Sequence, residues 1–138
     1  MTHLIPNIAF DGTAEAAFNF YKDVLGGELR MMRWSDNPHC ENFSDADKQK
    51  IMHASLEIDG GSLMGNDFVP AMEGQTHIPG NNFTVTATPE TREEADRIYR
   101  ELSDGGVPAM PMQDMFWGGY FGFLVDKFGT QWMVHQGG

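Results

Sequence analysis

Residues 7–29 are NIAFDGTAEAAFNFYKDVLGGEL, and this stretch decides the fold. Its apolar residues from Ala14 to Leu25 fall at helical spacing after Thr13, which suits the N-cap position, and a Gly-Gly pair follows as a stop. The stretch therefore predicts a helix over residues 14–25, with an alternating strand over residues 7–10 before it and another strand over residues 28–34 after it.

The same order returns in the second half of the chain. Residues 82–106 are NFTVTATPETREEADRIYRELSDGG, in which an alternating strand over 82–85 leads to a helix with a capping-box pattern at Thr91 and Glu94. Two hairpins, over residues 53–67 and 120–135, and a short strand near residues 108–112 complete the two halves. Each half thus predicts the order β-α-β-β-β.

This repeat predicts an α+β fold of two βαβββ modules. We expect one domain over residues 1–138, with module one at about 1–70 and module two at about 80–138. Each helix needs a sheet face to cover, so the helices should lie on the outer face of mixed sheets, and the other face is free to enclose something.

Period-2 alternation assigns side chains to the two faces of each sheet. Under the helices we expect Ile8, Phe10, Ala54, Leu56, Ile58, Met64, Phe83, Val85, Phe121, Phe123, Val125, Trp132 and Val134. On the opposite faces we expect Asn7, Ala9, His53, Ser55, Glu57, Leu63, Gly65, Asp67, Asn82, Thr84, Thr86, Tyr120, Gly122, Leu124, Gln131, Met133 and His135. A solvated sheet face would also look polar, so alternation alone does not distinguish a cavity wall from a surface.

Composition narrows the partners and the compartment. Twenty acidic against nine basic residues give a net charge of −11, which repels nucleic-acid phosphates and anionic membrane surfaces. No apolar run approaches the roughly 20 residues that span a bilayer. A single cysteine, Cys40, cannot form an intramolecular disulfide, which suits a reducing compartment. We therefore expect a cytoplasmic protein with no nucleic-acid or membrane partner.

Several motifs carry a resemblance to a known superfamily. Residues 17–29 (AFNFYKDVLGGEL) and 126–132 (DKFGTQW) resemble the vicinal-oxygen-chelate superfamily, which includes glyoxalase I, bleomycin-resistance proteins and extradiol dioxygenases. Within it, residues 51–54 (IMHA), 63–67 (LMGND), 116–118 (FWG) and 128–132 (FGTQW) are similar to the PhnB-like branch. The resemblance implies curved mixed sheets around a cavity, but the fold hosts lyases, dioxygenases, isomerases and binders, so it does not fix an activity.

The resemblance also implies where metal ligands would stand. The superfamily places His and Glu ligands on the first and fourth strands of each module, and the internal alignment puts those places at Asn7, Gly65, Asn82 and Met133. Two amides, a missing side chain and a soft thioether are a poor set for a Lewis-acid ion. We therefore expect no metal. We also expect no cofactor, because no Gly-rich loop follows a strand, although PhnB-like proteins often carry a methyltransferase label.

The candidate ligand-binding residues come from the predicted cavity face and the turn beside it. They are His53, Ser55, Glu57, Asp67, Trp117, Tyr120, Gln131 and His135. The histidines and carboxylates could hold a ligand, form an acid/base pair, build a displaced metal site, or simply make the wall polar. The soft and aromatic run from Met110 to Tyr120 could line a binding wall or pack in a core or dimer interface.

We predict a PhnB-like, metal-independent protein that binds a small organic molecule as a homodimer. One alternative is a metal-dependent lyase or dioxygenase that uses His53, Glu57, Asp67 or His135 as displaced ligands. Another is an interaction module without a ligand. The sequence does not identify the ligand or catalytic residues, nor whether the modules pair within one chain or between chains.

Overall fold

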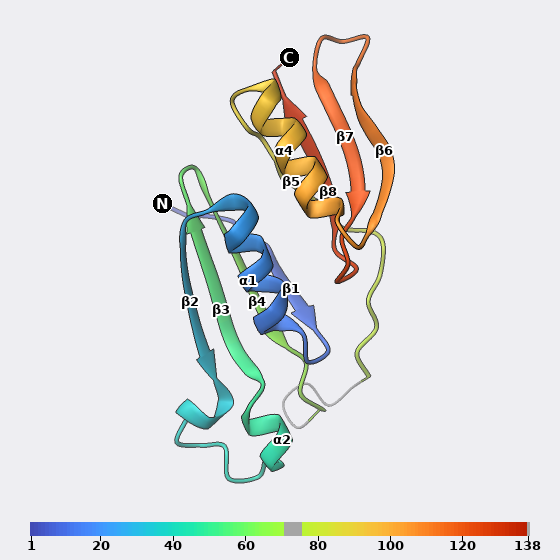
Figure 1. Ribbon diagram of the computed structural model, residues 1–138. Coiled ribbons are helices and arrows are strands. Elements are labelled where there is room, and N and C mark those ends of the chain that lie inside the picture. Colours follow the sequence, from blue (N-terminus) through green and yellow to red (C-terminus); the bar gives the residue numbers. More distant parts are fainter. Residues whose placement is uncertain (71–75, 138) are drawn as a thin grey trace. The chain divides into compact units, whose positions relative to one another are not determined.

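The computed structural model describes residues 1–70 and 76–137. The chain divides into two compact units, Met1–Ile78 and Pro79–Gly138. Each unit contains one four-stranded mixed sheet with a long helix packed on it (Figure 1). The predicted α+β architecture of two βαβββ modules is therefore confirmed.

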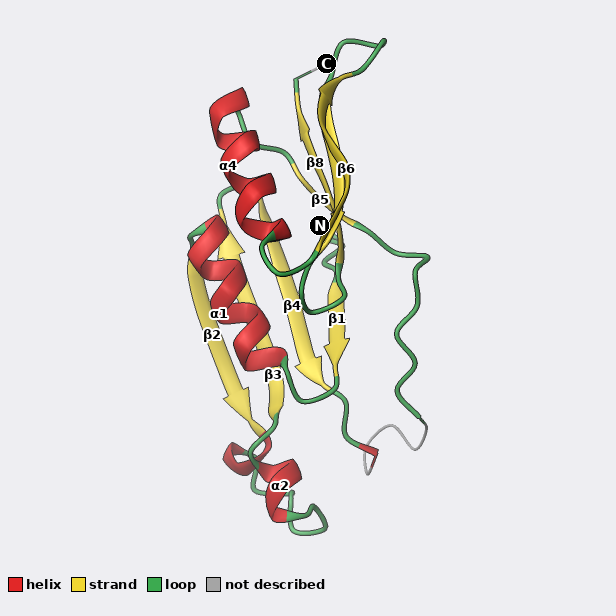
Figure 2. Ribbon diagram, turned by 45° about the vertical axis from the view of Figure 1, so that its right-hand side comes forward, coloured by secondary structure: helices red, strands yellow, loops and turns green. Residues whose placement is uncertain are grey.

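The first unit has the strand order β1-β4-β3-β2, in which β1 runs parallel to β4 and the other neighbours are antiparallel. Figure 2 shows α1 lying along one face of this sheet. A short 3-10 helix, η1, and a short helix, α2, join β2 to β3. The elements in chain order are β1 (Asn7–Phe10), α1 (Ala14–Leu25), β2 (Glu28–Arg33), η1 (Trp34–Asp36), α2 (Asp45–Lys48), β3 (Ile51–Ile58) and β4 (Gly61–Asp67).

The second unit repeats this topology with the strand order β5-β8-β7-β6. Its elements are β5 (Val85–Ala87), α4 (Arg92–Ser103), β6 (Val107–Asp114), β7 (Tyr120–Val125) and β8 (Gln131–Gln136). The strand predicted over residues 82–85 begins only at Val85. The side chain of Gln131 explains the difference, because its Nε2 donates to the carbonyl oxygens of Asn81 (3.1 Å) and Phe83 (2.6 Å).

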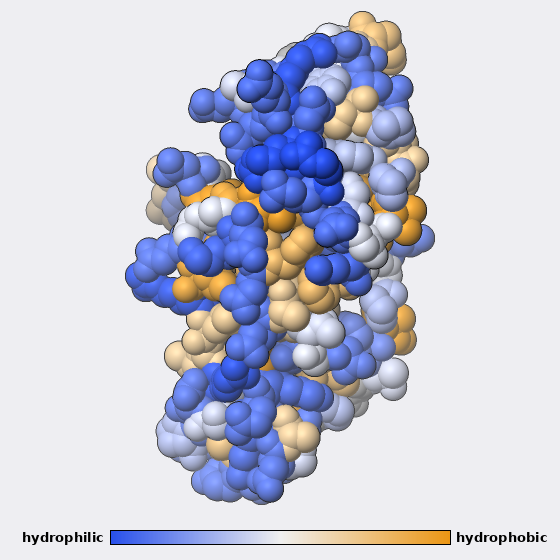
Figure 3. All heavy atoms as spheres, viewed as in Figure 1, coloured by the Kyte–Doolittle hydropathy of each residue, from blue (hydrophilic) through white to orange (hydrophobic). Residues whose placement is uncertain are grey.

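The two helices begin in different ways. Thr91 caps α4 as predicted, since its hydroxyl accepts a hydrogen bond from the Glu94 amide (3.1 Å). Thr13 occupies the N-cap of α1 but makes no capping bond with its side chain. The outer surface of α4 carries charged residues over its whole length, and Figure 3 shows it as a continuous hydrophilic area.

Glycines on the strands make room for aromatic side chains of the helices. A Cβ at Gly65 on β4 would lie 2.4 Å from Cε1 of Phe18 on α1. A Cβ at Gly122 on β7 would lie 2.9 Å from Cε2 of Tyr99 on α4. Both glycines therefore face their helices, and each close approach excludes a side chain.

The faces predicted for β4 and β7 are wrong. Directly paired residues share a face, and Ala54 pairs with Gly65 while Leu56 pairs with Leu63. Leu63, Gly65 and Asp67 therefore point toward α1, and Met64 points away. In the second unit Trp132 pairs with Leu124 and Val134 with Gly122. Accordingly Tyr120, Gly122 and Leu124 point toward α4, and Phe121, Phe123 and Val125 point away.

Candidate functional site

The face of the first sheet that turns away from α1 is polar, and we call it the polar face. Arg30 pairs with Ser55, Met32 with His53, and Glu57 with Ser62. Its residues are Asn7, Ala9, Glu28, Arg30, Met32, His53, Ser55, Glu57, Ser62, Met64 and Asn66. The placement predicted for His53, Ser55 and Glu57 on one open face is therefore confirmed, while their predicted role in binding stays a prediction.

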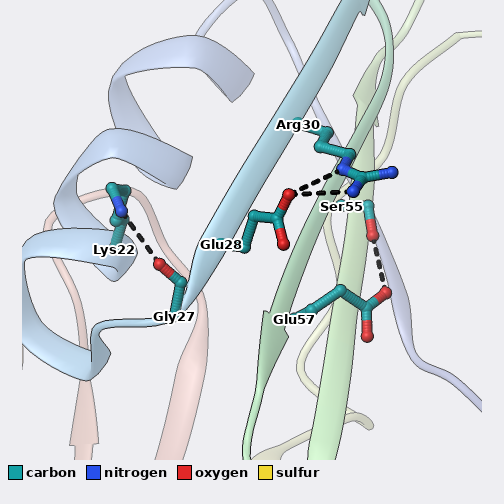
Figure 4. A network of polar contacts seen from close by, with 6 residues as sticks. All are labelled: Lys22, Gly27, Glu28, Arg30, Ser55 and Glu57. Atoms are coloured by element: carbon teal, nitrogen blue, oxygen red, sulfur yellow. Dashed lines mark hydrogen bonds and ion pairs between the residues drawn. The ribbon is translucent and has the colours of Figure 1, made fainter.

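A hydrogen-bond network orders one end of the polar face (Figure 4). Glu57 accepts hydrogen bonds from the hydroxyls of Ser55 (3.1 Å) and Ser62, and Arg30 donates to Glu28 through Nε (3.1 Å) and Nη2 (2.8 Å). The Ser62 bond, then the Ser55 bond and then the charge of Arg30, lower the pKa of Glu57. Glu57 is thus an ionised acceptor at neutral pH and is a poor proton donor.

Asp67 lies on the helix side of the first sheet, and its predicted place on the open face is wrong. Asp67 as a whole is only 3% exposed, and its Oδ1 and Oδ2 accept hydrogen bonds from the amides of Ala14 and Ile51, each at 2.9 Å. The Ala14 amide belongs to the first turn of α1, whose N–H groups have no partner within the helix. Asp67 therefore supplies an acceptor for the first of these N–H groups, and Thr13 makes no side-chain capping bond.

The set proposed for a displaced metal site is not gathered on one surface, because Asp67 and His53 point to opposite faces of the first sheet. Across residues 1–70 and 76–137, no group of three or more His, Cys, Asp and Glu side chains could hold a metal ion.

The four places implied for the superfamily's metal do not fit one either. Gly65 faces α1, and Asn82 is exposed before β5 begins. Asn7 donates through Nδ2 to Oδ1 of Asn66 (2.9 Å), and Met133 offers a thioether. None of the four places carries a carboxylate or an imidazole, and Asn7 and Asn82 offer only neutral amide oxygens, so this donor set does not suit a Lewis-acid ion.

The face of the second sheet that turns away from α4 is rich in rings, and we call it the aromatic face. Phe121 pairs with His135, Phe123 with Met133, and Val125 with Gln131. These six residues are all half-buried, and they share the aromatic face with Thr86 on β5 and with Val107, Met110 and Gln113 on β6. Sequence reasoning missed Phe121 and Phe123. The register of the β7–β8 hairpin could have found them, because it places Leu124 rather than Phe123 opposite Trp132.

Tyr120 lies on the α4 side of the second sheet, so its predicted place on the face opposite the helix is wrong. Its hydroxyl donates to Oδ1 of Asp96 on α4 (2.6 Å), and the Arg92 guanidinium lies 4.3 Å from its ring centroid. Arg92 also forms an ion pair with Asp114 at the end of β6. The hydrogen bond to Asp96, followed by burial, raises the pKa of Tyr120. This cluster ties the start of α4 to β6 and β7.

Trp117 and His135 meet at one end of the aromatic face. Trp117 belongs to the turn between β6 and β7, and its ring stands edge-on to the His135 ring with centroids 5.2 Å apart. His135 Nε2 is buried, and it has no hydrogen-bond partner among residues 1–70 and 76–137. Gln131, in contrast, already uses its amide nitrogen for the backbone before β5. Of the predicted residues in this unit, Trp117 and His135 are therefore the pair that the fold brings together.

None of the described helices is both long enough and apolar enough to cross a membrane.

Comparison with known proteins agrees with this architecture. The model of the family described as 3-demethylubiquinone-9 3-methyltransferase matches residues 2–135. YjdN of Escherichia coli (strain K12) is 29% identical, and the match covers 96% of this chain and 93% of YjdN. The crystal structure of PA1353 from Pseudomonas aeruginosa is 32% identical with a TM-score of 0.88, covering 99% of this chain and 98% of that one.

A more distant solved structure shares the fold. The putative 3-demethylubiquinone-9 3-methyltransferase, PhnB protein, from Bacillus cereus is 23% identical with a TM-score of 0.76, and the match covers 99% of this chain and 100% of that one. The resemblance drawn from the sequence motifs is confirmed. The chain belongs to the 3-demethylubiquinone-9 3-methyltransferase family.

Proposed function

We propose that this PhnB-like protein binds a flat, partly apolar organic molecule on the aromatic face of its second unit, without a metal ion. The observation that carries the proposal is the pairing of Phe121 with His135 and of Phe123 with Met133. A sheet face that meets only water carries mainly polar side chains, as the polar face of the first unit does. Rings and a thioether suit a flat ligand, because rings stack and methionine adapts its shape.

The family description gives the ligand class more detail. It names a demethylated ubiquinone, which is a flat ring with oxygen substituents. Such a molecule needs an apolar wall for its ring and a few polar contacts for its oxygens. On the aromatic face, Phe121 and Phe123 offer the apolar wall, and His135 offers one polar contact.

Tryptophan fluorescence tests the proposal. The probes are 1,4-naphthoquinone and 2-naphthol, with cyclohexanol as a non-aromatic control, titrated into the native protein, Phe123→Ala and Phe83→Ala. Phe83 is an exposed ring before β5 and serves as the matched control. Loss of one ring contact weakens binding by about 2- to 12-fold. We expect this loss in Phe123→Ala alone, and no saturable quenching by either aromatic probe would refute the proposal.

Metal independence is part of the same proposal. The donor sets around Asn7 and Met133 support it, since they lack the ligands that Lewis-acid ions prefer. Zn²⁺, Ni²⁺, Mn²⁺ or Fe²⁺ added to the dialysed protein should leave its melting temperature within about one degree, whereas an ion at a hundredfold excess over its Kd adds about 2.7 kcal/mol of stability. A shift of several degrees that His53→Ala or His135→Ala removes would favour the metal-dependent alternative.

We also propose a cytoplasmic homodimer. Strands β2 and β6 end their sheets, and exposed Val107 and Met110 lie on β6. Free edges and apolar surface favour association with a second copy. The free cysteine, Cys40, is compatible with a reducing compartment. Light scattering at micromolar concentration should report twice the chain mass of 15.4 kDa, and a stable monomer would refute the dimer.

A further inference from the structure

His135 has an unused ring nitrogen in a buried place. Its Nε2 is shielded from solvent, and none of the residues that the structure describes gives it a hydrogen bond. A buried polar atom without a partner costs free energy, so such an atom calls for a water, an ion or a ligand. Two apolar rings lie beside His135: Phe121 is opposite on β7, and Trp117 makes a T-shaped contact with the imidazole.

The turn that carries Trp117 is small and closed by its own backbone. The Met115 amide donates to the Gly119 carbonyl (2.7 Å), and the Gly118 amide donates to the Met115 carbonyl (3.0 Å). Trp117 is 45% exposed and its neighbour Phe116 is 99% exposed, so little else holds these rings in place. Gly118 has a φ of 102°, which a residue with a side chain rarely adopts.

Gly119 allows Trp117 to lie over His135. A Cβ at Gly119 would lie 2.1 Å from Cζ3 of Trp117 and 2.7 Å from Nε2 of His135. Both atoms are at the far ends of side chains, and the backbone of Gly119 lies outside the left-handed region. A methyl group at this place would therefore push the two rings apart while the strand stays intact.

We propose that Trp117 is a displaceable cover, and that a ligand moves it aside to place a ring-bound hydroxyl on His135 Nε2. This inference rests on the proposed function, because it uses the same aromatic face. A neutral imidazole presents one donor and one acceptor nitrogen. A hydroxyl both donates and accepts, so it satisfies Nε2 in either tautomer. The ligand class is thus a flat aromatic alcohol.

The test compares 2-naphthol with 2-methylnaphthalene, which differ by a hydroxyl in place of a methyl group of similar size. Calorimetry should give the native protein about a tenfold preference for 2-naphthol, the size of one hydrogen bond. His135→Phe keeps a ring against Trp117 and should lose the preference. His135→Gln serves as a second variant if His135→Phe does not fold, and it should keep part of the preference.

Gly119→Ala tests the cover. The other two tryptophans, Trp34 and Trp132, are only 9% and 1% exposed, whereas the Trp117 ring is half-exposed. A shift of the tryptophan emission when the Trp117 ring moves therefore reports on Trp117. Without ligand, the emission of Gly119→Ala should lie at longer wavelength than that of the native protein, and both probes should bind more tightly because no cover has to move. In the Trp117→Phe background, which still places a smaller ring over His135, adding Gly119→Ala should leave the emission unchanged.

The outcomes separate the two proposals. If neither probe binds any form of the protein, this inference fails, and the proposed function fails with it when 1,4-naphthoquinone does not bind either. If both probes bind with equal affinity, or if His135→Phe keeps the native preference, the aromatic face binds rings but His135 is not the polar contact. Unchanged emission in Gly119→Ala would refute the cover.

Discussion

The two units bury their helices in the same way and use their open faces differently. In both, a strand glycine admits an aromatic side chain of the helix, Gly65 for Phe18 and Gly122 for Tyr99. The polar face of the first unit carries a network centred on Glu57, whereas the aromatic face of the second pairs rings with His135 and Met133. The helix side is thus constrained by packing, and the open side is where repeated modules can differ in function.

The largest expected effect is on the helix side of the first unit. Asp67→Asn keeps one carbonyl acceptor but turns an NH₂ group toward a backbone amide, so it loses one of two buried charge-assisted bonds. We expect the free energy of unfolding to fall by about 2–4 kcal/mol. Urea denaturation measures the change, with exposed Asp59→Asn as the control. Equal midpoints for the two variants would show that Asp67 does not hold α1.

A smaller loss of stability should follow from filling the glycine space. Gly65→Ala places a methyl group against Phe18 and against the carbonyl oxygen of Ile8, which is 2.9 Å from the added Cβ. Overpacking of this kind costs about 1–3 kcal/mol. Gly61→Ala on the same strand is the control, since no atom lies within 4 Å of its Cβ. Thermal unfolding followed by circular dichroism should separate the two variants, and a native melting temperature for Gly65→Ala would contradict the packing described.

Tyr120 gives the second unit a dependence on alkaline pH. Its pKa is raised because its hydroxyl donates to Asp96, so the neutral form is favoured by folding. That stability is present below the unfolded pKa of about 10 and is lost as pH rises through the folded value. Tyr120→Phe should be slightly less stable than the native protein at pH 8 and should lose less stability between pH 9 and pH 11. Parallel pH profiles of the two proteins would refute this role.

The smallest effect concerns the polar face, where Glu57 is fully solvated. Its pKa is lowered mainly by the hydrogen bond from the Ser62 hydroxyl. The stability that this bond gives to the folded state is therefore present above the ordinary pKa of 4.5, and it is lost as the pH falls through the folded pKa. Ser62→Ala should move the titration of Glu57 back toward 4.5, as followed by NMR of its carboxyl carbon. Ser35→Ala, in η1 and away from this network, should leave it unchanged. An identical titration curve in Ser62→Ala would remove Ser62 from the network.

The sequence predicted the elements well and the faces of two strands badly, for a physical reason. The spacing of Ala14, Ala17 and Phe18 and the glycines after Leu25 define α1 almost by themselves. Alternation along β4 or β7 allows two assignments, because either set of side chains can face the helix. The polar side chains of Asp67 and Tyr120 favoured the wrong assignment, since both form hydrogen bonds with the helix side of their sheet. The hairpin register, which pairs Leu56 with Leu63, would have decided between the assignments.

The candidate site was predicted only in part. His53, Ser55 and Glu57 follow one strand, so their common face needs no more than alternation. The contact between Trp117 and His135 joins a turn to the last strand, and it depends on the missing side chain of Gly119, whose position no periodicity reveals.

The bonds of Asp67 also bear on the order in which the first unit folds. Its acceptor atoms serve amides at residues 14 and 51, so the first turn of α1 is completed by a residue 53 positions further along the chain. Asp67 reaches that place through the parallel pairing of β1 with β4, where it lies beside Phe10. A nascent helix over residues 14–25 would therefore fray at its start until the last strand of the unit docks, which makes helix and sheet form as one cooperative step.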